Sequence, residues 1–405
     1  MDLRNNVSIW LVLALFAQTC AVVVGQTDEV QATVIGNVKF AFDLYREVAQ
    51  SDSGNVLISP WSVTCGLVAA RIGADGETAA EISKAACFDS SNNALLRGFG
   101  AVSERVQELQ DGTGVTLRRA TGIWCHPEQP LLEDFVLGCR LAIGAKVLDA
   151  SFDSRAINQW ISEQTMGKIQ NLLGPQDLDP LSRLVLVDAL YYKAPWQRQF
   201  ASAATRPGKF TLSSGKTVEV AMMRGEQSAD YCLYQGAQVL QLPYKGGGAV
   251  MLLILPTETD GLAAIEKALS VEWLRGCRKS RKASIVKVVL PTFTVSQGLK
   301  LNSALQHLGI VKAFTGDADF SRIDGNRTNL FIDAVLQKAY MEVNEQGTEA
   351  AVATGTHWMT RSAQMAESFI CDRPFLFMIY AVKAGTILFV GRITDPSQSI
   401  MSGGI

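Results

Sequence analysis

The chain has 405 residues, of which 48% are hydrophobic and 19% charged, and its formal net charge is −2. This length can bury a large core, and the near-zero charge gives no global electrostatic reason to expect nucleic-acid or membrane binding. The sequence contains no internal repeat, long linker or low-complexity segment. Apart from an N-terminal leader, it therefore predicts a single domain.

Residues 1–25 have the pattern of a secretory signal peptide. Arg4 gives a weakly basic start, and the apolar run Ile9–Ala17 is too short to span a bilayer. Small residues suit cleavage after Gly25, which would leave 26–405 as the mature domain, and a cut near Ala21 is the alternative. We therefore expect a secreted, extracellular protein without a membrane anchor.

Seven cysteines remain once the leader is removed, and none of them lies in a CxxC motif. They are Cys65, Cys87, Cys125, Cys139, Cys232, Cys277 and Cys371. This pattern argues against zinc or redox chemistry, so we expect no metal and no cofactor. Cys125 and Cys139 are the pair we consider for a disulfide, and the odd count leaves at least one free thiol unless the chain dimerises through it.

A buried helix is predicted over Trp61–Ile72. Ser59 can cap its N-terminus, Pro60 suits its first turn, and the segment is apolar nearly all round. Further along, Leu184–Tyr192 is typical of a buried strand.

The segment from Met341 to Ser362 joins a strand pattern to a run of small residues. Residues 340–344 alternate with a period of two, Gly347 interrupts them, and residues 348–355 are small apart from Glu349. A surface loop is usually rich in Pro, Asn, Asp and charge, whereas this one could be buried. Helix propensity favours a short helix over Glu349–Ala353 as the alternative. We favour a segment that is exposed in one state and buried as a strand in another.

The stretch Glu345-Gln-Gly-Thr-Glu-Ala-Ala-Val-Ala-Thr354 resembles the hinge of an inhibitory serpin. The likeness covers nearly the whole mature chain, because further motifs follow in the family's order: Gly73-Ala-Asp-Gly-Glu-Thr78, Leu131-Leu-Glu-Asp-Phe135, Leu242-Pro-Tyr-Lys245 and Arg373-Pro-Phe375. The chain is similar to arthropod haemolymph serpins, which suggests a clotting-like, melanisation or innate-immunity cascade.

The resemblance implies an α+β serpin fold. It would have a large, mainly antiparallel central β-sheet, further sheets, about nine helices and an exposed reactive loop at about 345–366. Two core strands between Arg373 and Arg392 would close the fold.

In this family the cleaved loop inserts into the sheet as a new strand. The matching hinge residues are Glu345, Gly347, Thr348, Glu349, Ala350, Ala351, Val352 and Ala353. The side chains that would face inward are small or β-branched and uncharged: Thr348, Ala350, Val352, Thr354 and Thr356. A bulky or charged residue among the first of these would oppose insertion by its steric or desolvation cost, and Gly347 gives the backbone its freedom to fold in.

The family's spacing places the scissile bond fourteen residues after Gly347, at Arg361-Ser362. Arg361 is also the only basic residue between Gly347 and Gln364. An arginine there implies a trypsin-like serine protease as partner, with an acidic group in its specificity pocket, held in a covalent 1:1 complex. Met359 and Thr360 are the alternative cleavage positions.

Two positions depart together from the family's pattern. Asp188 stands where the family has Asn, and Gln337 stands where it has His. A carboxylate on a central strand needs a donor or a raised pKa, so we predict that Gln337 donates to Asp188, helped by Ser59 or Ser62. With Trp196, these residues would form a cluster where the sheet must open.

The surface offers three further expectations. Asn326-Arg-Thr328 is the only glycosylation sequon in the mature chain, so we predict a glycan on Asn326. Five basic residues lie within Arg275–Lys282, and we favour a solvated loop there over a polyanion or protease exosite. Few basic residues occupy Arg97–Gln110, where the family's heparin-binding members carry them, so no strong heparin dependence is expected.

Two rival functions can be weighed. An enzyme is disfavoured because the chain has only three histidines and lacks a Gly-x-Ser-x-Gly elbow, a metal-spaced cluster and a Walker loop. A non-inhibitory serpin, acting as carrier, chaperone or store, would often carry bulky, charged or proline residues in the hinge. Trp358 is a bulky residue that fits poorly into a sheet, but most of the loop would already be inserted when it enters. We therefore expect a monomeric, secreted suicide inhibitor.

Overall fold

The computed structural model describes residues 5–88, 91–110, 114–148, 152–174, 178, 182–326, 330–348, 367–398 and 400–401, and only the backbone of 5–27 and 400–401. Helices in this part of the chain are α1 (Asn5–Ser51), α2 (Pro60–Gly73), α3 (Gly76–Ala85), α4 (Asn92–Gln107), η1 (Glu108–Gln110), α5 (Glu133–Ile143), α6 (Ser154–Gln164), η2 (Ser202–Ala204), α7 (Leu262–Ala268), α8 (Val271–Ser280), α9 (Asn302–His307), η3 (Lys312–Phe314) and α10 (Ser321–Asp324). The elements labelled η are short 3₁₀ helices.

The strands lie between these helices, often several in succession along the chain. They are β1 (Val56–Ile58), β2 (Thr116–Cys125), β3 (Lys146–Leu148), β4 (Leu184–Pro195), β5 (Arg206–Thr211), β6 (Thr217–Tyr234), β7 (Ala237–Pro243), β8 (Ala249–Pro256), β9 (Lys282–Pro291), β10 (Phe293–Lys300), β11 (Ala334–Asn344), β12 (Gly347–Thr348), β13 (Glu367–Ile370), β14 (Phe375–Ala381), β15 (Thr386–Ile393) and β16 (Ile400–Met401).

Two sheets collect these strands. The first has seven strands in the order β16-β10-β11-β12-β4-β2-β3, and β11 also pairs directly with β4. The second has nine strands, in the order β1-β15-β14-β8-β7-β6-β9-β13, with β5 beside β6. This architecture confirms the predicted α+β class with a large sheet and further strands.

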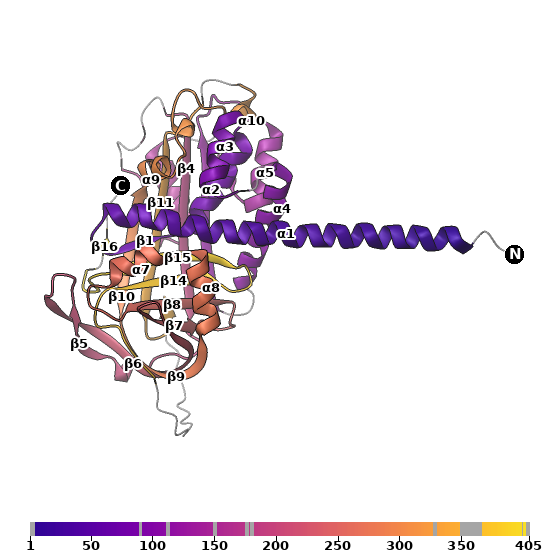
Figure 1. Ribbon diagram of the computed structural model, residues 1–405. Helices are drawn as coiled ribbons and strands as arrows, with labels where there is room; N and C mark the ends of the chain where they lie inside the picture. Colours follow the sequence, from indigo (N-terminus) through magenta and orange to yellow (C-terminus); the bar gives the residue numbers. More distant parts are fainter. Residues whose placement is uncertain are drawn as a thin grey trace.

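The buried helix expected from the sequence is present as α2. Ser59 is its N-cap and accepts a hydrogen bond from the Ser62 amide at 3.3 Å, and Pro60 is its first residue. Every residue of α2 is buried, as its apolar character on all sides predicts. Figure 1 shows α2 beside β4, with α3, α4 and α5 around it.

Strand β4 is buried on both faces because its alternate residues enter two different cores. Val185, Val187, Ala189 and Tyr191 pack in a smaller cluster with Ile157 and Ile161 of α6. Leu184, Leu186, Leu190 and Tyr192 belong to the main core, which also holds α2. Asp188 shares the second alternation, so its carboxyl lies on the face of the sheet that α2 covers.

Two further segments, α1 and the basic stretch Arg275–Lys282, bear on the expectations drawn from the sequence. The backbone of α1 continues from Asn5 to Ser51, and its N-terminal part extends away from the body (Figure 1). None of the helices in the described part of the chain combines the length and hydropathy that crossing a membrane requires. The basic stretch Arg275–Lys282 is not a loop, because Trp273, Leu274 and Cys277 are buried at helical spacing and make it the end of α8 and the start of β9.

Cys125 and Cys139 are both free thiols, as are the five other cysteines whose side chains are described. The disulfide considered for that pair is therefore absent from the structure.

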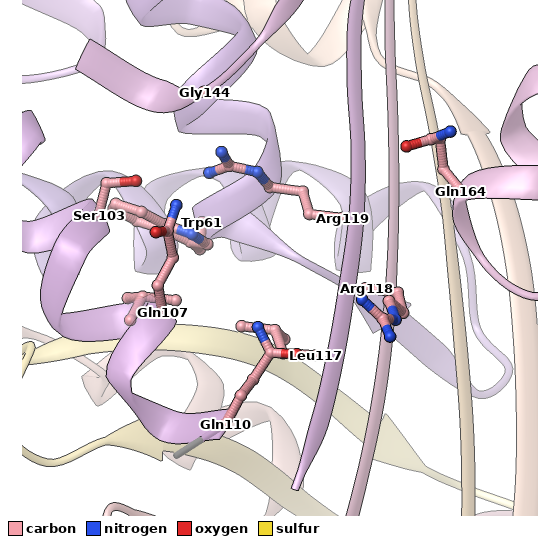
Figure 2. Close-up of a pocket in the computed structure, with 10 residues that line it drawn as sticks. Trp61, Ser103, Gln107, Gln110, Leu117, Arg118, Arg119, Gly144 and Gln164 are labelled. Carbon is pink, nitrogen blue, oxygen red and sulfur yellow. The ribbon is translucent and has the colours of Figure 1, made fainter. Parts of the chain in front are cut away.

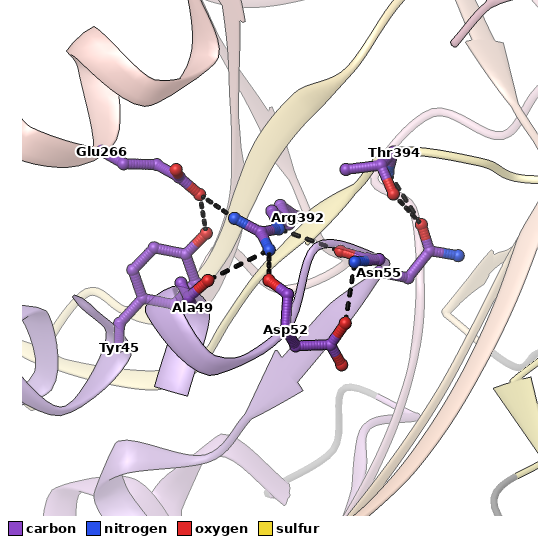
Figure 3. Close-up of polar contacts among 8 residues, drawn as sticks. Tyr45, Ala49, Asp52, Asn55, Glu266, Arg392 and Thr394 are labelled. Atoms are coloured by element: carbon purple, nitrogen blue, oxygen red, sulfur yellow. Dashed lines mark hydrogen bonds and ion pairs between the residues drawn. The ribbon is translucent and has the colours of Figure 1, made fainter. Parts of the chain in front are cut away.

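Two C-terminal strands, β14 and β15, confirm the core strands expected between Arg373 and Arg392. Arg392 joins β15 to α1 and α7 through a buried network (Figure 3). Its guanidinium donates to Glu266 at 2.9 Å and to the carbonyls of Ala49, Asp52 and Gly54, and Tyr45 donates to the same carboxylate at 2.6 Å. The Arg392 side chain is 8% exposed and that of Glu266 is 15% exposed.

We expect Arg392→Met to lower the free energy of unfolding by about 3–5 kcal/mol, because it leaves the Glu266 carboxylate without its cationic partner and three carbonyls without the donor that Arg392 supplies. Urea unfolding would measure this. The matched control is Arg322→Met, because Arg322 pairs with Asp75 at 3.1 Å but both side chains are nearly half exposed. That control should change stability by less than about 1 kcal/mol, and an equal loss in both variants would contradict the role given to Arg392.

Candidate functional site

The candidate site is the place where β11 and β4 separate. The two strands pair in parallel from Ala334 with Val185 to Tyr340 with Tyr191. Beyond that point the chain turns back after β11, and β12 enters between them. Gly347 and Thr348 are antiparallel to both neighbours, opposite Asn344 and Val343 on one side and Pro195 and Ala194 on the other. Two residues of the predicted hinge, Gly347 and Thr348, are thus already a short strand inside the sheet.

Only glycine can occupy position 347 in this arrangement. Its φ is +153°, and a Cβ there would lie 2.1 Å from the Ala194 carbonyl oxygen and 2.6 Å from the Pro195 Cα. The sequence indicated that Gly347 supplies backbone freedom. The structure adds that it lets two backbones approach more closely than any side chain would allow.

Thr348 follows at a fully buried position. Its hydroxyl lies 2.6 Å from the hydroxyl of Tyr244. Tyr244 in turn stacks on Trp196, with ring centroids 4.7 Å apart and planes 8° from parallel. The small, hydrogen-bonded side chain therefore fills the space between the sheet and this aromatic pair.

The turn before β12 is held by backbone and side-chain hydrogen bonds. The Trp196 indole donates to the Asn344 carbonyl at 2.9 Å, and its amide donates to the Gln346 carbonyl at 2.8 Å. Glu345 accepts from the Phe200 amide at 2.9 Å and from the Thr205 hydroxyl at 2.6 Å. These contacts fix the point from which the hinge starts.

The predicted hydrogen bond from Gln337 to Asp188 is wrong. The Gln337 amide nitrogen donates to the Ser59 carbonyl at 2.6 Å and to the Ser62 hydroxyl at 2.9 Å, and its oxygen accepts from the Ser59 amide at 3.2 Å. Both amide hydrogens are therefore used at the N-terminus of α2. Ser59, Ser62 and Gln337 do form a cluster, and it ties β11 to α2.

Asp188 lies opposite Gln337 in the register but has a different partner. The Thr121 hydroxyl of β2 donates to its Oδ1 at 2.7 Å, while its Oδ2 has no hydrogen-bond partner among the residues that the structure describes. Burial raises the pKa of the Asp188 carboxyl to about 7, although the hydrogen bond from Thr121 and the charge of Arg119 act to lower it. On α2, Gly66 gives Oδ2 its space, since a Cβ there would lie 2.6 Å away.

Trp196 does not belong to this cluster, in contrast to the prediction. It follows the end of β4, eight residues after Asp188, which is roughly 25 Å along an extended strand. The site therefore has two parts, the hinge seat around Trp196 and Tyr244 and the Ser59–Ser62–Gln337 cluster with Asp188 beside it.

Several partners in the site were missed from the sequence. The sequence around these partners has no motif that indicates a role, because each of them reaches the site through strand register or tertiary packing. They are Thr121, Phe200, Thr205 and Tyr244. Tyr244 lies in the motif Leu242-Pro-Tyr-Lys245, which was noticed only as a family likeness.

The remaining predicted loop residues lie outside the described part of the chain. They are Glu349, Ala350, Ala351, Val352, Ala353, Met359, Thr360, Arg361 and Ser362. Asn326 is described and its side chain is exposed, whereas Thr328 of its sequon is not described.

A separate open cavity of about 300 Å³ lies between α4, β2 and the end of α5 (Figure 2). Arg118 and Arg119 line it, and no carboxylate is among its lining residues in the described part of the chain. Arg119 donates to the Cys65 sulfur at 3.0 Å and to the Ile143 carbonyl. The cavity does not reach the hinge seat, so we leave it out of the site. No group of three or more metal-ligating side chains occurs among the residues searched, which are those described.

Comparison with known proteins gives a consistent result. A family model described as Serpin (serine protease inhibitor) matches residues 36–396. The chain is 36% identical over 376 residues to Serpin B6 of Pongo abelii and 35% identical over 376 residues to the leukocyte elastase inhibitor of Equus caballus. Each alignment covers 89% of this chain and 98% of the relative. The solved structure of Serpin48 from the insect Tenebrio molitor matches with a TM-score of 0.79 at 33% identity, covering 90% of this chain and 98% of that one.

The chain therefore belongs to the serpin family, which the matching family model describes as serine protease inhibitors.

The buried carboxyl makes stability depend on pH. The unfolded Asp188 titrates near pH 4 and the folded one near pH 7, so the folded state holds the proton more tightly between these values. The free energy of unfolding should therefore fall by on the order of 4 kcal/mol as the pH rises from about 4 to about 7, and it should keep this lower value at higher pH.

Asp188→Asn keeps the acceptor for Thr121 and removes the charge. We expect this variant to have a higher thermal midpoint than the natural protein at pH 8 and a similar one at pH 4.5. Thermal scans at a fixed rate across this range would measure the difference. Asp317→Asn, at an exposed carboxylate, is the control and should follow the natural protein at every pH. If the thermal midpoint of Asp188→Asn also equalled that of the natural protein at every pH, Asp188 would not titrate between pH 4.5 and pH 8.

Proposed function

We propose that this serpin is a secreted suicide inhibitor that traps a trypsin-like serine protease by inserting its cleaved loop between β11 and β4. The observation that carries the proposal is the position of Gly347 and Thr348, which already pair with both strands. A loop that starts inside the sheet needs no new nucleation step in order to continue as a strand.

The pairing around the seat gives insertion a source of free energy. β11 and β4 are parallel to each other, whereas a strand continuing from β12 would be antiparallel to both. Insertion would replace one parallel ladder by two antiparallel ladders. Antiparallel pairing is slightly more stable per residue, and the added ladder brings further backbone hydrogen bonds. While the loop is tethered at both ends, the native sheet is kinetically trapped short of this state.

The register of β12 also determines where later residues would lie. Because Thr348 faces Ala194 and Val343, each residue added moves one position back along both neighbours. Thr354 would then lie between Asp188 and Gln337 and point to the same face. Its hydroxyl would then be able to donate to Asp188 Oδ2, for which the described part of the chain offers no partner. Insertion would thus satisfy a buried oxygen that the native sheet leaves unpaired.

The chemistry follows from Arg361 as the bait. The protease serine attacks the Arg361 carbonyl and forms an acyl-enzyme, releasing the amine of Ser362. Insertion then carries the tethered protease along the sheet. Distortion of its oxyanion hole alone would slow deacylation by roughly 10²–10³-fold. The inhibitor is consumed in a covalent 1:1 complex.

Secretion and glycosylation belong to the same proposal. The family model begins at residue 36, so the sequence carries a preceding segment that can hold the signal at 1–25. On α1, Glu29 already contacts α4 through its ion pair with Arg97 at 2.6 Å, which suits a mature domain that starts at Gln26. The exposed Asn326 just after α10 suits a glycan.

We expect Arg361→Ala to slow inhibition of trypsin by about 30-fold to a few thousand-fold, because it removes a charge pair worth about 2–5 kcal/mol in the specificity pocket. Arg361→Lys is the control and should retain inhibition. Mass spectrometry of the peptide released on denaturation tests the bond directly, since cleavage at Arg361 yields a peptide that begins with Ser362. A peptide beginning at Thr360 or Arg361 would instead move the bait to Met359 or Thr360.

Thr348→Arg should convert the inhibitor into a substrate that trypsin cleaves without being trapped. The guanidinium would have to enter a fully buried position beside Tyr244, which opposes insertion. Thr348→Ser keeps the hydroxyl and should still form a complex that survives SDS. If the arginine variant also formed that complex, insertion would not start at this seat. If the natural protein were cleaved without forming a complex, the non-inhibitory alternative would hold.

A further inference from the structure

Two cysteines far apart in the sequence have their sulfur atoms in contact. Cys232 is on β6 and Cys277 is on α8, and their Sγ atoms are 3.6 Å apart. Cys232 is 6% exposed and Cys277 is fully buried. Neither cysteine has a role in the proposed insertion of the loop.

The close approach of α8 to β6 brings the two thiols together. Gly276 precedes Cys277, and a Cβ at this glycine would lie 2.0 Å from the Tyr234 hydroxyl. Tyr234 also packs edge-on against Trp273, with ring centroids 5.6 Å apart. The helix start is fixed by Ser270, whose hydroxyl accepts from the Trp273 amide at 3.0 Å. A glycine and an aromatic contact thus hold the helix close to the strand.

We propose that Cys232 and Cys277 are a redox-sensitive pair that forms a disulfide on exposure to a low-molecular-weight disulfide such as glutathione disulfide. The sulfurs need to approach from 3.6 Å to a bond length of about 2.05 Å. Rotation of the side chains can supply such a movement while helix and strand stay in place.

The exchange begins at Cys232. This thiol is the more exposed of the two, and the hydrogen bond that it shares with Cys277 and the charge of Arg281 lower its pKa, against the effects of burial and of Asp230. The same hydrogen bond and burial raise the pKa of Cys277. Since the thiolate is the nucleophile, Cys232 attacks first and Cys277 resolves the mixed disulfide.

The reaction balances with one glutathione disulfide. The Cys232 thiolate attacks one of its sulfurs, forms a mixed disulfide and releases the first glutathione thiolate. Cys277 then loses its proton and attacks the Cys232 sulfur, and the second glutathione thiolate leaves. The protein gives up two electrons and two protons, and glutathione disulfide is reduced to two glutathione thiols.

The cross-link would stabilise the molecule without touching the sheet that opens. It joins two residues 45 positions apart and so constrains the unfolded chain. Its Cys232 end lies in the nine-stranded sheet and its Cys277 end in α8, whereas β4 and β11 belong to the seven-stranded sheet. Protease inhibition should therefore be unchanged by oxidation.

The test uses the full chain, incubated with glutathione disulfide and then denatured and labelled with a maleimide. We expect two fewer labelled thiols than in the reduced protein, and a tryptic peptide pair joined through Cys232 and Cys277. The oxidised protein should also have a thermal midpoint about 3–5 °C higher than the reduced one.

Matched variants separate this pair from the other thiols. In Cys232→Ser, glutathione disulfide should not reduce the number of labelled thiols by two and should not raise the thermal midpoint. Cys87→Ser, at the least buried cysteine described, should respond to glutathione disulfide like the natural protein. An unchanged thiol count in the natural protein, or joined peptides that contain any other cysteine pair, would overturn the proposal. The identification of the joined peptides uses only the natural protein, so this test remains decisive even if a variant fails to fold.

Discussion

The contact between Gly347 and the backbone of β4 is the constraint on which the rest of the site depends. It lets the chain leave β11, turn through Glu345 and Gln346 and re-enter the same sheet within a few residues. Any Cβ at this position would collide with main-chain atoms, which cannot move aside as a flexible side chain can. Everything that follows at the seat, including the burial of Thr348 against Tyr244, requires this approach.

Gln337 of β11 and Asp188 of β4 lie opposite each other in the register but make their hydrogen bonds to different elements. Gln337 satisfies its amide at the start of α2, so it ties a strand to a helix rather than to the neighbouring strand. Asp188 accepts from Thr121 through one carboxyl oxygen, and its other oxygen has no hydrogen-bond partner within the described ranges of the chain. An unpaired buried acceptor weakens the state that contains it, and here it lies beside the line along which β4 and β11 would part. The native sheet therefore carries an unsatisfied polar atom beside the strands that the proposed insertion would separate.

The sequence was most informative where a local rule decides the outcome. Ser59 and Pro60 determine the start of α2, the alternation along Leu184–Tyr192 predicts a doubly buried β4, and the small residues after Gly347 indicate a segment fit for a sheet. The sequence did not predict hydrogen-bond and packing partners that depend on strand register and tertiary contacts. Whether Gln337 turns toward Asp188 or toward Ser59 depends on the position of α2 over the sheet, and Trp196 lies a strand's length from the cluster to which it was assigned. The meeting of Cys232 with Cys277 rather than Cys125 with Cys139 also depends on tertiary contacts.

The network around Arg392 has a consequence for the fate of the chain after a cut at residue 361. The downstream fragment would contain β14 and β15, which are interior strands of the nine-stranded sheet, and Arg392 would still be anchored to α7 and to the carbonyls at the end of α1. The two pieces would remain one particle in native solution, separable only by a denaturant. The cleaved molecule would keep both fragments and its hydrophobic core. The peptide bond after residue 361 would therefore not be needed to hold the folded molecule together.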